Sequence, residues 1–411
     1  MIEPLYWLTI TGANGLNKNV FICISILLIA FATVSCKSKS EANQVKPIED
    51  TTGIIKLPPP KPLRTAEFNR IKIRCQQWYD SVFNYGNFNG GMLVAKSGNI
   101  IFEKYNGCGH IGQTDTINSN TANHIASVSK TFTAMGILKL VQDGKVQLDD
   151  ELNKYFPDFK YPGVTVRDLL DHRSGLPNYL YFMDELGWDK KYAMTNQDVF
   201  NWLISKKAQI KDISKPNTHF TYCNTNYALL ALLIEKLSGT PYPQFMRDSF
   251  FKPLQMKSSF VFTPADSARI NLSYDWRGGL IPLNFLDAVY GDKNIYTTPR
   301  DLLRWDRALS TNLIFNQDIL QQAYSPYSNE RPGIRNYGLG WRMNIYPDGK
   351  KLIFHNGWWH GSNAVFIRMI DEDAVIILIG NKYSRGIYKA KYLVNLFNPS
   401  LSQEEEEEEG K

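Results

Sequence analysis

The stretch Ile125-Ala126-Ser127-Val128-Ser129-Lys130-Thr131-Phe132-Thr133-Ala134 begins a long run with apolar residues at regular intervals. The intervals match a helix and predict one buried face, formed by Val128, Phe132, Met135 and Leu138. Gly144, after Asp143, is a typical helix stop. The pattern therefore predicts a buried helix that carries Ser127 and Lys130 in its first turn.

The spacing of Ser127 and Lys130 has a chemical meaning, because residues three apart are neighbours on a helix. A serine hydroxyl is a weak nucleophile until a base takes its proton. A lysine packed against apolar surface is less stable in its charged form and can be that base. Free N–H groups at a helix start also suit an oxyanion. So short a motif also arises by chance, and Ser249 and Lys252 form a second match in this sequence. Other motifs are therefore needed to identify Ser127 as a nucleophile.

The composition of the 411 residues is that of a globular protein, with 43% apolar and 13% aromatic residues. The net charge is +6, but the basic residues are scattered, so we expect no nucleic-acid partner. No cysteine pair has CxxC spacing and the H-E-x-x-H signature is absent, so we expect no metal and no cofactor. Cys75 and Cys108 are interpreted as two separate buried thiols, with a disulfide as the alternative.

The N-terminal part contains a 15-residue, mostly apolar run from Val20 to Val34. This run is short for a membrane span, which needs about 20 residues, and is typical of a signal peptide. It ends in Ala32-Thr33-Val34-Ser35-Cys36, which is similar to a bacterial lipoprotein cleavage site with Cys36 as the lipidated residue. An uncleaved anchor or an ordinary secretory peptide is the alternative. Residues 1–17 lack a basic side chain, which indicates a start site placed too far upstream.

These signals divide the chain into segments. We expect a lipoprotein-type signal segment at 1–36 and a polar, Pro-rich tether at 37–65. A single folded domain at 66–398 and an acidic disordered tail at 399–411 follow. The expected localisation is the cell envelope, with the protein anchored to a membrane through its lipid and facing the periplasm or the exterior.

Within the folded part, strand patterns lie at both ends and helix patterns in the middle. A helix is predicted from Phe68 to Tyr85, and a β-hairpin has strands Gly91–Lys96 and Ile100–Lys104. Thr165 is the predicted cap of another helix. Strand patterns return between 338 and 379. We therefore expect an α+β fold: an antiparallel sheet from the N- and C-terminal segments, flanked by helices, with a mostly helical inserted region and a cleft where the two meet.

Two further stretches carry polar residues between apolar ones. They are Phe220-Thr221-Tyr222-Cys223-Asn224 and Phe354-His355-Asn356-Gly357-Trp358. With Ser127-x-x-Lys130, they resemble the three active-site motifs of the serine β-lactamase and penicillin-binding-protein superfamily. The pattern is most similar to the class C-like branch, which also contains esterases and D-amino-acid peptidases. The resemblance covers about residues 68–381 and implies a β-lactamase/transpeptidase-like fold.

The resemblance assigns a role to each matching residue. Ser127 is expected to be the acylated nucleophile, Lys130 to help remove its proton, and Tyr222 to pass a proton to the leaving group. Asn224 is expected to hold Lys130 and the substrate amide. His355 and Gly357 match the Lys-Thr-Gly strand in its His-x-Gly form, and Gly357 would let substrate lie along the strand. The backbone N–H groups of Ser127 and Trp358 are expected to form the oxyanion hole.

One departure limits what the resemblance implies about the substrate. His355 and Asn356 replace a Lys and a Thr that help lactam-binding members hold the substrate carboxylate, and a neutral His holds it less well. Our leading hypothesis is a serine hydrolase acting on a small ester or peptide, including a D-amino-acid peptide derived from the cell wall. The alternatives are a catalytically idle envelope protein that binds peptidoglycan or a partner, and a true β-lactamase. The sequence does not indicate an oligomeric state.

Overall fold

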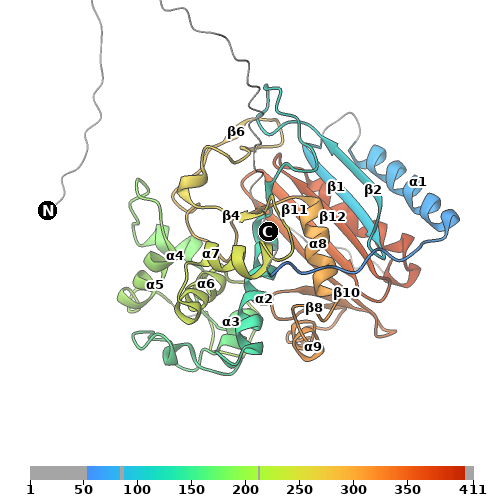
Figure 1. Ribbon diagram of the computed structural model, residues 1–411. Coiled ribbons are helices and arrows are strands. Elements are labelled where there is room, and N and C mark those ends of the chain that lie inside the picture. The colour runs from blue at the N-terminus through green and yellow to red at the C-terminus, as the bar shows by residue number, and fades with distance from the viewer. Residues whose placement is uncertain (1–52, 84–87, 212, 403–411) are drawn as a thin grey trace, which may run out of the picture. The chain divides into compact units, whose positions relative to one another are not determined.

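A seven-stranded antiparallel sheet has the strand order β2-β1-β12-β11-β10-β9-β8 in the computed structural model, which describes residues 53–83, 88–211 and 213–402 (Figure 1). Its strands are β1 (Gly90–Lys96), β2 (Asn99–Asn106), β8 (Arg335–Tyr337), β9 (Arg342–Ile345), β10 (Lys351–Trp359), β11 (Ser362–Met369) and β12 (Ala374–Gly380). The N-terminal strand β1 pairs with the C-terminal strand β12, from Gly90 opposite Gly380 to Lys96 opposite Ala374. The predicted α+β fold, with a sheet built from both ends of the domain, is therefore confirmed.

Helices cover the sheet and fill the middle of the chain. The α-helices are α1 (Thr65–Val82), α2 (Ser129–Gln142), α3 (Val166–Leu170), α4 (Tyr179–Glu185), α5 (Asn196–Ser205), α6 (Asn224–Ser238), α7 (Tyr242–Met246), α8 (Pro299–Leu309) and α9 (Gln317–Ala323). Shorter or tighter helical segments are η2 (Ala126–Val128), η3 (Leu152–Lys154), η4 (Arg247–Phe251), η5 (Pro264–Asp266), η6 (Arg385–Leu396) and η7 (Pro399–Ser402). Two-stranded and three-stranded sheets are formed by β3 (Asn123–His124), β4 (Phe260–Val261), β5 (Ser273–Tyr274), β6 (Leu280–Ile281) and β7 (Ile295–Thr297).

Alternation along the central strands gives the sheet two apolar faces, because successive side chains of a strand point to opposite sides. In β12, Ile377 and Ile379 belong to the large core with α2, α6 and α8, whereas Ile376 and Leu378 belong to a second core with α1 and η6. Figure 1 shows α8 over the sheet and the helical region α3–α7 beside it. The sheet is thus the middle of three layers, which explains why its central strands are apolar on both faces.

Helix α2 is buried almost all round, and not on one face as its periodicity predicted. Every residue from Ser129 to Leu138 is buried, and α6 and α9 pack against the helix. The α-helix also begins two residues after Ser127, which lies in the tight turn η2. Ser127 and Lys130 are still neighbours, as predicted, because η2 leads directly into the first turn of α2.

Several local signals were confirmed. Thr165 caps α3 with a capping box that pairs it with Asp168, and Gly239 ends α6 in the left-handed conformation. Cys75 and Cys108 are free thiols, Cys75 buried and Cys108 half-buried, so the disulfide alternative is excluded. After β12 the chain forms a tight helical segment, η6, that begins at Arg385.

The described part of the expected tether differs from a free linker. From Gly53 to Arg64 the chain is extended and lies on the folded domain, where the Ile55 N–H donates to the Pro253 carbonyl at 2.8 Å and the Lys61 N–H to the Ser97 carbonyl at 2.9 Å. Ile55 and Leu57 pack against the large core. The apolar run 20–34, Cys36 and the acidic run after 402 lie outside the described residues. Among the described helices, none has the length and apolar character of a membrane span.

Candidate active site

Ser127 and Lys130 form the centre of the candidate site. The Lys130 Nζ lies 3.1 Å from the Ser127 Oγ and donates to the Asp292 backbone carbonyl at 2.8 Å. Lys130 is completely buried, whereas Ser127 is half-buried. Both hydrogen-bond partners of the amine among the described residues are neutral oxygen atoms. In the second Ser-x-x-Lys match, Lys252 is exposed at the end of η4, which has none of these properties.

The backbone in front of the nucleophile adopts an unusual conformation that a buried histidine supports. Ala126 has a φ of +47°, which is unfavourable for a residue with a Cβ. Its N–H donates to the His124 Nδ1 at 3.2 Å, and the His124 Nε2 lies 3.1 Å from the Asn294 Oδ1. Burial lowers the pKa of His124 to about 4, so the ring is neutral at physiological pH. A neutral ring accepts at Nδ1 and donates at Nε2, which joins the turn of Ser127 to the residues before β7.

Tyr222 is brought to the same place from the segment that precedes α6. The Lys130 Nζ is 5.0 Å from the centre of the Tyr222 ring, and the Tyr222 hydroxyl is buried without a hydrogen-bond partner in the described part of the chain. Asn224 is the first residue of α6 and is half-buried. The amine of Lys130 bonds to Ser127 and Asp292, and the expected contact with Asn224 is not among its hydrogen bonds in the described residues. A free hydroxyl on Tyr222 is available for a substrate atom.

His172 supports the Tyr222 segment. It has a φ of +61° and is completely buried. Its Nδ1 accepts the Cys223 N–H at 3.1 Å, its carbonyl accepts the Thr221 N–H at 2.9 Å, and its ring lies 4.3 Å from that of Tyr222. Burial, reinforced by the charge of Lys130, holds the pKa of His172 well below its usual value. These contacts hold both residues that flank Tyr222.

Strand β10 carries the third motif and lies against the turn of Ser127. A Cβ added at Gly357 would lie 2.3 Å from the Ile125 carbonyl oxygen and 3.1 Å from the Ala126 Cβ. Glycine is therefore required for the close approach of β10 to η2, a reason different from the expected path for substrate. The residue after it, Trp358, is on the same strand, and its side chain is 63% exposed.

His355 is completely buried and has both ring nitrogens occupied. Its Nδ1 lies 2.7 Å from the Asn356 carbonyl, to which it must donate, and its Nε2 lies 3.2 Å from the Tyr337 hydroxyl. Burial, with the nearby charges of Arg342 and Lys130, holds the pKa of His355 well below its usual value. A neutral, fully bonded imidazole has no charge to offer a substrate carboxylate, in line with the departure seen in the sequence.

The cation that faces this region is Arg342, on β9, which the sequence interpretation did not single out. Its guanidinium carbon lies 5.3 Å from the centre of the Tyr222 ring, and its Nε is buried without a hydrogen-bond partner among the described residues. Phe354 of β10 is directly opposite Arg342 in the sheet register, next to His355. The sequence could have pointed to Arg342, because it is a charged residue inside a predicted strand that leads to the third motif.

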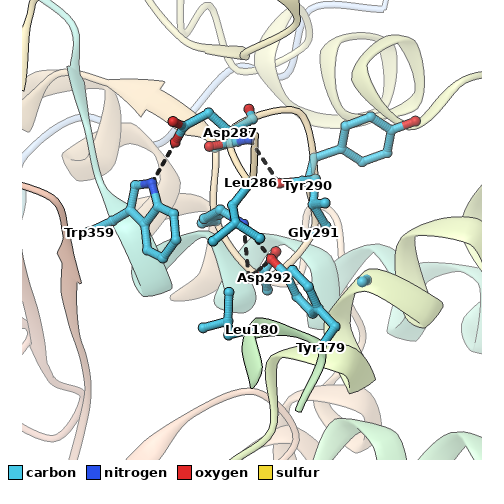
Figure 2. Close-up of polar contacts among 12 residues, drawn as sticks. Tyr179, Leu180, Leu286, Asp287, Tyr290, Gly291, Asp292 and Trp359 are labelled. Carbon is cyan, nitrogen blue, oxygen red and sulfur yellow. Dashed lines mark hydrogen bonds and ion pairs between the residues drawn. The ribbon is translucent and has the colours of Figure 1, made fainter. Parts of the chain in front are cut away.

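A loop that the sequence interpretation missed supplies the carbonyl that holds Lys130. We call residues 284–294 the bridging loop. Its Asp292 and Lys293 are both buried: the Tyr179 hydroxyl donates to the Asp292 Oδ2 at 3.0 Å, and the Lys293 Nζ lies 2.5 Å from the same hydroxyl. Figure 2 shows the Tyr179 hydroxyl facing Asp292. The sequence held one signal for this cluster, the adjacent charged residues Asp292 and Lys293.

Comparison with known proteins agrees with this arrangement. The family model described as Beta-lactamase matches residues 82–393. Penicillin-binding protein 4* of Bacillus subtilis is 30% identical over 338 residues, which cover 77% of this chain and 74% of that protein. Among solved structures, a penicillin-binding protein from Bacillus halodurans has a TM-score of 0.67 at 22% identity and covers 77% of this chain and 97% of its own.

A second solved structure, D-amino acid amidase from Ochrobactrum anthropi SV3, has a TM-score of 0.64 at 24% identity and covers 82% of this chain and 98% of its own. These two structures are too distant in sequence to establish more than the fold. The family match spans most of the described chain and includes the three motif stretches. The chain therefore belongs to the beta-lactamase family of serine hydrolases and penicillin-binding proteins, and is most similar to its class C-like branch.

Proposed function

We propose that the protein is a serine hydrolase that forms an acyl-enzyme on Ser127. The observation that carries the proposal is the 3.1 Å contact between the buried Lys130 amine and the Ser127 hydroxyl, with only neutral groups as further partners of the amine. Such a contact allows the amine to accept the hydroxyl proton as the oxygen attacks.

The reaction has two steps. In the first, the Ser127 Oγ bonds to the substrate carbonyl carbon and its proton passes to Lys130, while the N–H groups of Ser127 and Trp358 stabilise the oxyanion. The bond to the leaving group breaks as the Tyr222 hydroxyl gives it a proton, and the phenolate then takes the proton that Lys130 accepted from Ser127. In the second step, water attacks the acyl carbon, one of its protons passes through these groups to the Ser127 Oγ as the acyl bond to that oxygen breaks, and the acid product leaves.

Arg342 favours a substrate that carries an anionic group. The buried Arg342 Nε has no hydrogen-bond partner among the described residues, which is costly, and a substrate carboxylate would relieve that cost. His355 lacks the charge for this role. We therefore propose a peptide or amide with a free carboxylate, such as a D-amino-acid peptide from the cell wall, as the preferred substrate over a neutral ester. A D-amino acid amidase among the structural neighbours supports this choice.

A test compares the wild-type protein with Ser127→Ala in labelling by a fluorophosphonate and a fluorescent penicillin, with mass spectrometry of the Ser127 peptide. An adduct on Ser127 in the wild type only, followed by turnover of D-peptides or esters, supports the hydrolase. A folded wild type that forms no adduct with either probe would favour the idle envelope-binding protein. Rapid hydrolysis of nitrocefin would favour a true β-lactamase.

We also propose that Cys36 carries a lipid that anchors the protein in the cell envelope. The support is the apolar run followed by the Ala32–Cys36 sequence. Metabolic labelling with a radioactive fatty acid should mark the wild type and leave Cys36→Ala unlabelled. Equal labelling of both forms would exclude this site. The proposal predicts a protein that acts at the periplasmic or exterior side of a membrane.

A further inference from the structure

The bridging loop, residues 284–294, contacts residues on several sides of the candidate site. Its Asp292 carbonyl holds the Lys130 amine, and its Asn294 side chain faces His124 before the turn of Ser127. The loop is also bonded to itself, because the Asn294 Nδ2 donates to the Asp287 carbonyl at 2.7 Å and to the Val289 carbonyl at 2.8 Å. A displacement at one position of this loop will therefore reach the others.

Asp287 extends the loop to the third part of the site, the turn after β10. Its Oδ1 accepts the Trp359 indole N–H at 2.6 Å, and its two oxygens lie 3.2 and 3.1 Å from the His360 Nε2. Figure 2 shows the Trp359 indole N–H directed at the Asp287 carboxylate. Asp287 is 5% exposed, so these contacts are made away from water and are strong.

The turn that Asp287 holds directly follows the expected oxyanion donor. His360 has a φ of +53°, a conformation that a non-glycine residue keeps only when its surroundings enforce it. Its carbonyl accepts the Trp358 indole N–H at 2.8 Å, which ties Trp358 to the same turn. A small pocket lined by Asp287, Trp359 and His360, among other residues, lies against these contacts, so close packing does not hold the turn on that side.

We propose that Asp287 is a positioning residue for the oxyanion side of the site, which fixes the backbone N–H of Trp358 relative to Ser127 by holding Trp359 and His360. The inference rests on the proposed function, since an oxyanion hole matters only to a protein that acylates Ser127. Asp287 touches no reacting atom. It acts through the two residues that follow Trp358 and through a loop that also carries the Lys130 contact.

The chain offers a matched control at Asp266. Both carboxylates accept the backbone N–H of the residue three positions earlier: Asp287 that of Asn284 at 2.5 Å and Asp266 that of Thr263 at 2.7 Å. Asp266 does not contact Trp359 or His360 in the described residues, since its further partners are Thr263 and Arg269. Asp287→Asn and Asp266→Asn therefore remove the same local charge, and only the first disturbs the turn after β10.

The first experiment measures acylation of Ser127 by a chromogenic D-peptide ester. Asp287→Asn should lower the acylation rate ten- to a hundredfold with little change in KM, because oxyanion contacts strengthen in the transition state. Trp359→Phe, which keeps the ring and removes its N–H, should lower the rate in the same way. The double variant should lose no more than the worse single variant. An unchanged rate in Asp287→Asn, or a loss of the same size in Asp266→Asn, overturns the proposal.

A second measurement does not depend on turnover. Amide hydrogen exchange in the peptide that covers residues 357–361 should become faster in Asp287→Asn and stay unchanged in Asp266→Asn, at equal global stability. Unchanged protection in Asp287→Asn overturns the proposal even if no substrate is turned over. A wild type that fails to label at Ser127 but shows faster exchange in Asp287→Asn would contradict the proposed function and leave the structural role of Asp287 supported.

Discussion

Lys130 is placed for chemistry at a cost to the fold. The amine is completely buried, and both of its hydrogen-bond partners are neutral. A buried amine with such partners contributes less to stability than an apolar side chain of similar size. This is the trade of stability for activity that functional residues often show.

Lys130→Met should therefore separate the two properties. We expect the acylation rate of Ser127 to fall at least about a thousandfold, because the hydroxyl loses its base. We expect the free energy of unfolding to rise by about 1 kcal/mol, because the apolar side chain needs no hydrogen bonds. Burst kinetics and urea unfolding measure the two effects. A variant that stays active shows that another group takes the proton of Ser127.

Arg342 allows a test of substrate charge. Arg342→Gln keeps a polar side chain and removes the cation that lies over Tyr222. For a D-peptide with a free carboxylate we expect kcat/KM to fall about 10- to 100-fold, the value of one charge-assisted hydrogen bond. The same peptide with an amidated C-terminus should be hydrolysed equally by both proteins. Equal losses for both peptides would mean that Arg342 shapes the site without recognising the carboxylate.

At the scale of elements, the site depends on the distance between β10 and η2. That distance is set where Gly357 meets the Ile125 carbonyl, and an added Cβ would come within 2.3 Å of this oxygen. Backbone atoms are on both sides of the contact, so neither can rotate away as a side chain would. The two elements carry the two expected oxyanion donors, Ser127 and Trp358.

Gly357→Ala should force β10 and η2 apart. We expect a loss of about 1–3 kcal/mol in the free energy of unfolding, as for other overpacked positions, and a clear fall in the acylation rate. Thermal unfolding and labelling of Ser127 check the two effects. Gly349→Ala is a suitable control for stability alone, since no atom lies within 4 Å of a Cβ at that turn, although its positive φ adds some strain. Normal labelling in a folded Gly357→Ala protein would show that this spacing is not critical.

How far the sequence predicted these elements depends on whether the signal was local. The cap at Thr165 depends on a few neighbouring residues and was predicted. The sheet order was inferred only as a pairing of the two chain ends. Helix α2 was predicted with one buried face, because periodicity does not show that elements from other parts of the chain cover the remaining faces.

The candidate site was predicted where short motifs carry its residues. Ser127, Lys130, Tyr222 and His355 lie within such motifs, and the structure brings them together. Asp287, Asp292 and His124 were missed, because their roles depend on contacts between residues 72 to 170 positions apart, or on a backbone carbonyl that any residue could supply. A backbone contact leaves no side-chain signal in a single sequence.

Across the whole molecule, several buried titratable groups make stability depend on pH. Burial lowers the pKa of His124 to about 4 and holds those of His172 and His355 well below the usual value. Between the lowered and the ordinary pKa, near 6.5, the unfolded chain binds a proton that the folded chain does not. Each of these histidines therefore makes the fold more stable as the pH rises towards 6.5. Asp171 acts in the opposite direction, because burial raises its pKa to about 8.

The three histidines predict that the free energy of unfolding rises between pH 4 and 6.5. Asp168, Asp171, Asp301 and Asp306, whose pKa values burial raises, act against this rise. His124 alone accounts for a loss on the order of 3 kcal/mol on going from pH 6.5 to 4. Urea unfolding at intervals of half a pH unit measures the dependence of the free energy of unfolding on pH.

In His124→Gln the slope of the free energy of unfolding against pH, below pH 6.5, should fall by about 1.4 kcal/mol per pH unit, the value for one bound proton. An unchanged slope would show that His124 is already charged in the folded protein. A charged ring cannot accept the Ala126 N–H, so the proposed support of the turn before Ser127 would be wrong.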